Sequence, residues 1–196
     1  MPSAFESVLK NKNMAYRPQG AAPVGQAPVR VAFVLMDNFS MMSFTGAVDA
    51  LVTANLMSDM PLYEVLTVGA SGGQVTSDLG IVISTDIELA QLPDNLDVLI
   101  VAGGFRVKLQ GTPLLRRKLR AHATSGAIVG GLWNGVFFVA EANLLDGFEC
   151  AVHPESRATM AEMFPHVKVT SRAYVVDRER VSCAGANSSL RMMLQL

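Results

Sequence analysis

The fold of this chain is decided by the stretch Ile128-Val129-Gly130-Gly131-Leu132-Trp133-Asn134-Gly135-Val136-Phe137-Phe138. It predicts a buried strand, a sharp turn flanked by glycines and an apolar helix. The spacing Gly131-x-Trp133-x-Gly135 matches a nucleophile elbow, in which small neighbours let one strained side chain stand above a parallel sheet. An indole N–H only donates, so Trp133 can neither form a covalent intermediate nor shuttle a proton at neutral pH. The sequence therefore predicts the architecture of an active site without its reacting atom.

Composition limits the class of protein. The chain has 196 residues, 50% of them hydrophobic, and a mean hydropathy of +0.31, which suffices for one domain with a sizeable core. The chain has 17% charged residues and a formal net charge of -1, so it lacks the excess of positive charge that attracts phosphates. We therefore expect no DNA binding by this chain alone. No apolar run approaches the roughly 20 residues of a membrane helix, and no signal peptide opens the chain. We expect a cytoplasmic protein without membrane contact.

The two cysteines, Cys150 and Cys183, have neither CxxC spacing nor the Cys/His spacing of metal ligands. This pattern argues against a zinc site and against a disulfide framework. We therefore expect a reducing compartment, no metal and no cofactor.

Residues 1–28 are predicted to be a flexible leader, because they contain four prolines and two glycines and no sustained apolar period. The predicted domain covers residues 29–196. It opens with an apolar run over residues 30–36, which is typical of a strand covered on both faces. Apolar residues at helical spacing follow over residues 43–57.

Strands and helices are predicted to alternate along the rest of the chain. Strands are expected over residues 63–68, 96–102, 128–132, 167–169, 174–176 and 181–184, helices over 114–122 and 155–163, and a small edge hairpin near 75 and 81–83. Asn187 or Ser188 is expected to cap a closing helix that is still periodic at Leu194 and runs on past Leu196. This alternation predicts a parallel sheet with helices on both faces. Ligands in such folds lie outside the carboxyl ends of the strands, which selects residues 37–43, 103–106 and 133–134.

Several short motifs occur in a fixed order over residues 29–196. They are Phe33 to Leu35 followed by Phe44-Thr45-Gly46-Ala47, then Val101-Ala102-Gly103-Gly104, the elbow Gly130 to Phe137, Leu144-Leu145-Asp146-Gly147, and Ser182-Cys183-Ala184-Gly185-Ala186 before Leu190-x-Met192-Met193-Leu194. Together they resemble the PfpI-like branch of the class I glutamine amidotransferase-like superfamily. More narrowly, they resemble the amino-terminal sensor domain of AraC-type transcription regulators. The resemblance implies a flavodoxin-like three-layer α/β sandwich.

For enzymes of that superfamily, the resemblance implies a cysteine at the elbow, an acidic residue after strand one and a histidine beyond the elbow helix. Here the cysteine position holds Trp133 and the acidic position holds Ser43, so only His153 matches. Nucleophilic catalysis needs a nucleophile and a base within hydrogen-bond reach. We therefore predict that the chain has no catalytic residues.

The features that remain are those of a receptor. Helix starts and glycine turns leave N–H groups unpaired, so we expect those of residues 103–104 and 134–135 to converge on a negative group. The predicted ligand is a small carboxylate or an amino-acid-like metabolite with Trp133 as one wall, and a quaternary ammonium could stack on the indole. The predicted ligand-binding residues are Ser43, Gly103, Gly104, Phe105, Trp133, Asn134, His153 and Glu155.

Plainer interpretations exist for several of these residues. Trp133 can simply fill the cavity of the elbow. His153 can cap its helix, and Glu155 can be a favourable acid in a first helical turn. Cys150 and Cys183 are interpreted as small buried hydrophobic residues.

Three functions stay open at this point. The leading hypothesis is a ligand-sensing, homodimeric domain of a transcription regulator whose DNA-binding helix-turn-helix part is outside this chain. The second is an enzyme with a displaced nucleophile, in which Ser43, Cys150 or Cys183 works with His153. The third is a dimerisation scaffold that binds no ligand.

Overall fold

The computed structural model of the chain describes residues 12–13 and 27–196. Its strands are β1 (Val29–Leu35), β2 (Tyr63–Gly69), β3 (Gln74–Thr76), β4 (Val82–Ser84), β5 (Ile87–Glu88), β6 (Val98–Ala102), β7 (Ile128–Leu132), β8 (Glu149–Ala151), β9 (Lys168–Thr170), β10 (Tyr174–Asp177) and β11 (Arg180–Cys183). Its α-helices are α2 (Met41–Leu56), α3 (Pro113–Thr124), α4 (Val136–Glu141), α5 (Arg157–Met163) and α6 (Ser188–Met193). Short 3-10 helices are η1 (Leu89–Gln91), η2 (Trp133–Gly135) and η3 (Pro154–Ser156). None of these helices is long and apolar enough to cross a membrane.

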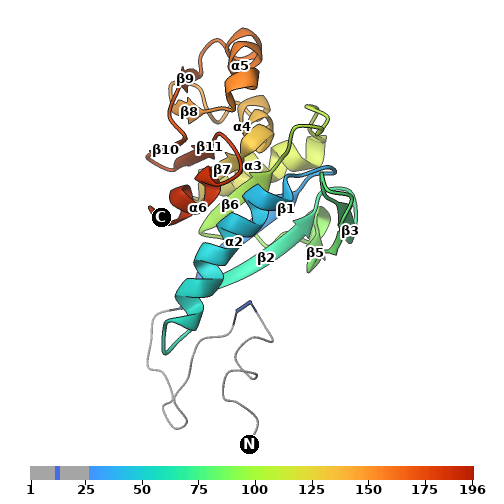
Figure 1. Cartoon of the computed structure of the whole chain (residues 1–196), viewed down its shortest axis with the longest axis vertical. Coiled ribbons are helices and arrows are strands. Elements are labelled where there is room, and N and C mark those ends of the chain that lie inside the picture. The colour runs from blue at the N-terminus through green and yellow to red at the C-terminus, as the bar shows by residue number, and fades with distance from the viewer. Residues whose placement is uncertain (1–11, 14–26) are drawn as a thin grey trace, which may run out of the picture.

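The main sheet of the described residues has seven strands in the order β10-β11-β7-β6-β1-β2-β5 (Figure 1). Its strands pair in parallel, except that β10 is antiparallel to β11. The pairs β3-β4 and β8-β9 form two small separate sheets. The predicted mostly parallel, flavodoxin-like α/β fold is confirmed.

Two apolar cores lie on opposite faces of the main sheet. Alternate residues of β1 enter different cores, Phe33 one of them and Val34 the other, as the two-residue period of a strand requires. The core around Phe33 includes Leu51 of α2 and Met192 of α6, and Figure 1 shows these helices together on one side of the sheet. The core around Val34 includes Leu119 of α3. The arrangement is a three-layer sandwich.

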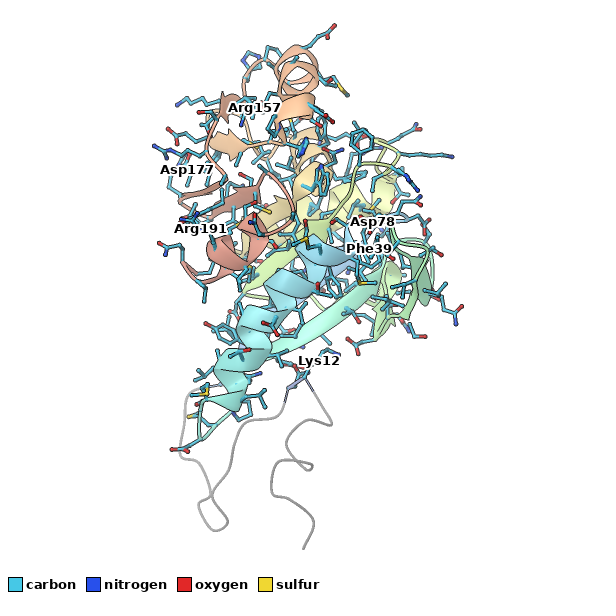
Figure 2. The ribbon with its side chains drawn as sticks, viewed as in Figure 1. Lys12, Phe39, Asp78, Arg157, Asp177 and Arg191 are labelled. Carbon is cyan, nitrogen blue, oxygen red and sulfur yellow. The ribbon has the colours of Figure 1, made fainter. Side chains whose placement is uncertain are left out.

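The start of α2 is fixed by contacts with a distant hairpin. Ser40 is the N-cap residue, and its Oγ accepts a hydrogen bond from Ser43 N at 3.4 Å. Asp78 Oδ1 accepts from Met41 N at 3.0 Å, and Asp78 N donates to Phe39 O at 2.9 Å. Figure 2 labels Phe39 and Asp78, which lie next to each other. The helix therefore begins two residues before its predicted start.

Other elements differ from the expectations at the edges of the fold. The hairpin predicted near residues 75 and 81–83 is confirmed as β3 and β4, but β5 and η1 have no counterpart among the predicted elements. Asn187 is the N-cap residue of α6, but its side chain makes no capping hydrogen bond. The closing helix ends earlier than its apolar period indicates, since α6 ends at Met193 with Leu194 as its C-cap residue.

The predicted leader, residues 1–28, falls mostly outside the described residues. Lys12 and Asn13 are described, and both contact the domain. The Asn13 side chain accepts from Val65 N at 2.7 Å and donates to Val65 O at 3.3 Å. Lys12 Nζ, labelled in Figure 2, forms an ion pair with Asp86 at 2.8 Å. These two residues therefore lie against β2 and the segment before β5.

Candidate functional site

Trp133 occupies the corner between β7 and α4 in a strained backbone conformation. Its φ is 54°, in the left-handed region that residues other than glycine rarely adopt. The neighbouring glycines allow this corner: a Cβ on Gly131 would lie 2.3 Å from Val136 N, and a Cβ on Gly135 would lie 2.0 Å from Val101 O. No side chain fits at either position. The strand, sharp turn and helix predicted for this stretch are all present.

The Trp133 indole stacks on the imidazole of His153. The ring centroids are 5.1 Å apart and the planes differ by 19°. The indole also lies against Gly185, where an added Cβ would be 3.0 Å from Trp133 Cδ2. Gly185 also has a φ of 129°, which residues with a side chain rarely adopt. Both its backbone conformation and its contact with the indole therefore require a glycine at this position. The two contacts fix the orientation of the indole.

A cavity of about 240 Å³ lies beside this stacked pair. Its lining includes Trp133, His153, Pro154, Ala173 and residues 184–188. Trp133 therefore forms one wall of this cavity. Of the residues predicted to bind a ligand, the cavity brings together Trp133 and His153.

Three buried side-chain polar atoms in the described part of the chain have no hydrogen-bond partner. They are Ser43 Oγ, Trp133 Nε1 and His153 Nδ1. An unpaired buried donor or acceptor costs about 1–3 kcal/mol, and folded proteins pair most such groups. The three residues are those that the resemblance places at the acidic, nucleophile and histidine positions. Among the described residues, the buried side-chain groups without a hydrogen bond thus belong to these three positions.

Asn134 joins the elbow to two other loops. Its Nδ2 donates to Gly104 O at 3.2 Å, and its Oδ1 accepts from Ser156 Oγ at 3.1 Å. Gly104 in turn lies against the loop after β1, since a Cβ on it would be 2.5 Å from Asn38 O. The Asn134 amide is therefore used within the fold, with the residue only 5% exposed.

The prediction that Gly103 offers its N–H to a ligand is wrong. Gly103 N donates to Leu132 O at 3.1 Å, so this donor is taken up by the neighbouring strand end. Gly103 also lies against the elbow, since a Cβ on it would be 2.2 Å from Gly135 N. This close approach leaves no room for an anion between Gly103 and Gly135.

Three other predicted residues do not line the cavity. Phe105 is 62% exposed in the loop after β6, and Glu155 is exposed in η3. Neither lines the cavity beside Trp133. Ser43 is fully buried in α2 and does not line it either. Phe105, Glu155 and Ser43 are therefore not part of the lining of this cavity.

The two thiols are enclosed in the protein interior. Burial raises the pKa of Cys150 from 9.0 to about 12, although a hydrogen bond with Ser182 opposes the shift. Burial also raises the pKa of Cys183, against the hydrogen bonds that it receives from the backbone of Trp133 and Gly185. A neutral, enclosed thiol is a poor nucleophile. In the described residues, no group of three or more His, Cys, Asp or Glu side chains is placed to hold a metal ion.

The loop over residues 184–188 contributes to the cavity and was not predicted as part of the site. It follows β11, which pairs in parallel with β7 so that Cys183 lies beside Leu132. The rule that ligands lie outside the carboxyl ends of strands therefore applies to this loop as well. Because the sequence predicts a strand over residues 181–184, the loop that follows it could have been predicted as part of the site.

Known proteins resemble this chain along most of its length. The DJ-1/PfpI family matches residues 29–196. The HTH-type transcriptional regulator GbdR of Pseudomonas aeruginosa is 35% identical over 90% of this chain and 48% of its own length. The HTH-type transcriptional regulator GlxA of Rhizobium meliloti is 32% identical over 84% of this chain and 51% of its own length. The chain thus spans about half the length of the curated relatives that it matches.

Solved structures agree with this assignment. The crystal structure of an AraC family transcriptional regulator from Pseudomonas putida is 41% identical, with a TM-score of 0.78 over 86% of this chain and 90% of that chain. Drosophila melanogaster DJ-1beta, at 19% identity and a TM-score of 0.74 over 86% of this chain and 88% of its own, shares the fold. This chain belongs to the DJ-1/PfpI family.

Proposed function

We propose that this chain is a non-catalytic, ligand-sensing domain of an AraC-family transcription regulator. Its relatives include proteins named as HTH-type regulators, and it spans about half of their length. A helix-turn-helix unit needs its own helices and basic residues to enter a DNA groove. We assign DNA binding to a domain outside this chain.

The observation that carries the proposal is the pair of unpaired atoms on Trp133 and His153, two residues that line one cavity. At the position where the resemblance implies a nucleophile, Trp133 offers a donor that cannot react. Unsatisfied polar groups of this kind favour a bound partner, which would supply the missing hydrogen bonds. The elbow then recognises a molecule without transforming it.

The chemistry of these groups favours a small carboxylate or an amino-acid-like metabolite. The indole N–H is a donor and needs an acceptor, and carboxylate oxygens accept strong hydrogen bonds. Among the described residues that line the cavity, His153 adds a second unpaired ring nitrogen, Nδ1, beside the indole. The cavity of about 240 Å³ is smaller than the pockets of drug-sized ligands, about 300–1,000 Å³, so the ligand is small. The unpaired atoms are enclosed, so we expect the two rings to shift when the ligand binds.

Isothermal calorimetry of the chain against a panel of small carboxylates and amino acids tests the proposal. We expect at least one of them to bind and to be recovered unchanged. Trp133→Phe keeps a ring and removes the Nε1 donor, and we expect it to weaken binding about tenfold, the loss of one hydrogen bond to a charged group. The matched control is Tyr63→Phe, which removes a donor at the amino end of β2. A panel without a binder, or a product formed from the ligand, would refute the proposal.

The proposal includes a homodimer in the cytoplasm, where the regulator would meet its DNA. Regulators of the helix-turn-helix type commonly bind two half-sites as dimers. Sedimentation equilibrium at micromolar concentration reports the mass directly. A mass of one chain over the whole concentration range would count against dimerisation by this domain.

A further inference from the structure

A second cavity, of about 400 Å³, lies at the carboxyl ends of β1, β2 and β6. Its walls come from the loops that follow these three strands and from the start of α3. It shares no lining residue with the cavity beside Trp133. It is therefore a separate candidate site on the same domain.

The sheet topology places this cavity at the point where the strand order reverses. From β1 the chain continues to β2 on one side and later returns to β6 on the other side, so β1 pairs with both. The loops after β1 and β6 therefore run to opposite faces of the sheet. A crevice opens between such loops, and open α/β sheets bind ligands there.

The cavity combines an apolar floor with a basic rim. Met36, Val107 and Leu115 supply the floor, and Val107 and Leu115 are 8% and 1% exposed. Arg106 and Lys108 are exposed at the rim, and neither takes part in the ion pairs of the described residues. Two cations above an apolar surface suit a molecule with an apolar body and an anionic end.

The loop that carries both cations is anchored at each end. At its start, Gly104 O accepts hydrogen bonds from Asn134 Nδ2 at 3.2 Å and from Val107 N at 3.4 Å. At its end, Gly111 N donates to Glu141 Oε2 at 2.7 Å, and Arg116 Nη1 donates to Gly111 O at 3.1 Å. A loop held in this way loses little conformational freedom on binding, which favours affinity.

We propose that this cavity is a second ligand site, which binds a small organic anion. Arg106 and Lys108 contact the anionic group, a carboxylate or a phosphate monoester, and the apolar body covers Met36, Val107 and Leu115. Guanidinium and ammonium groups both bind such anions through charge-assisted hydrogen bonds. Asp37, the acidic residue of the lining, accepts a hydrogen bond from a hydroxyl or amino group of the ligand. The site is independent of the function proposed for the elbow.

Amide chemical shifts of the isotope-labelled chain test this site with three probes. Phenyl phosphate and phenylacetate are the anions, and 2-phenylethanol is the neutral counterpart. We expect both anions to shift the amides of residues 36–38 and 106–110, and the alcohol to bind at least tenfold more weakly. Arg106→Gln and Lys108→Gln are each expected to raise the Kd of the anions about tenfold, the effect of losing one charge-assisted hydrogen bond.

The matched control is Arg117→Gln, which removes the same charge from an exposed position of α3 outside the cavity. We expect it to leave the Kd of the anions unchanged. An equal loss in Arg117→Gln, equal binding of 2-phenylethanol, or shifts confined to residues 133 and 184–188 would overturn the proposal. Shifts at residues 36–38 and 106–110 separate this site from the elbow, because the two cavities share no lining residue. The function proposed for the elbow is tested separately, by calorimetry.

Discussion

Trp133 combines a strained backbone with an unreactive side chain. A non-glycine residue in the left-handed region costs about 1–3 kcal/mol and persists only where its surroundings determine its conformation. The φ of 54° is held by the glycines around the corner and by the contacts of the indole with His153 and Gly185. The corner is thus a property of the fold, and the residue placed there decides whether it can react.

Cys150 and Cys183 are expected to resist alkylation in the native protein. Burial raises the pKa of both thiols, to about 12 for Cys150, so the reactive thiolate is scarce at neutral pH and is also enclosed. Intact mass after treatment with iodoacetamide checks this: the native chain should gain no label, and the chain in denaturant should gain two.

The denatured sample is the control for reagent quality in that experiment. Rapid labelling of one cysteine in the native chain would restore the hypothesis of a displaced nucleophile. Slow labelling that follows the rate of unfolding is consistent with two buried thiols.

The sequence predicts a residue of the candidate site only where the local backbone geometry determines where its side chain lies. Trp133 and His153 were both selected, and the structure stacks them. Gly103 was assigned a free donor, but the register of β6 against β7 directs its N–H to Leu132 O. Phe105 and Glu155 follow a strand end or open a helix, and nothing in the local sequence shows that their side chains point to solvent. Strand register and side-chain direction are tertiary properties, so the local sequence does not show where these groups point.

At the scale of secondary structure, the elbow depends on close contacts between its own elements. Gly131, the residue before the last of β7, lies against the start of α4, and Gly135 lies against β6. The sequence pattern predicted the strand and the helix because the apolar run is broken only by small residues. Boundaries set by distant partners were less predictable: α2 begins at Met41 because Asp78, from the β3-β4 hairpin, accepts the Met41 N–H.

Gly131→Ala is expected to destabilise the domain by about 1–3 kcal/mol or more, the range for an overpacked core. The new Cβ would lie 2.3 Å from Val136 N and 2.5 Å from Val136 Cα, so β7 and α4 must move apart. Urea unfolding followed by circular dichroism measures the change.

The matched control for this substitution is Gly73→Ala, in the loop before β3. An added Cβ there meets nothing within 4 Å, so we expect a change within about 0.5 kcal/mol. Equal stability of the two variants would show that the elbow is not as tightly packed as the structure indicates.

For the whole molecule, the parallel sheet places both candidate cavities at the carboxyl ends of its strands. The loops after β1, β2 and β6 surround one cavity, and the ends of β7 and β11 surround the other. The alternation of strands and helices predicts this location, since the carboxyl ends of all parallel strands lie on the same side of the sheet. The cavities themselves were not predictable, because each is formed by residues from loops that are far apart in the sequence.

The fluorescence of Trp133 tests the central claim most directly, since it is the single tryptophan among the 196 residues. The proposed elbow site predicts that a carboxylate found by calorimetry changes the emission saturably, with the same Kd, while chromatography shows the ligand intact. An emission that stays constant at saturating ligand, or a ligand that is consumed, would contradict a site that recognises without reacting.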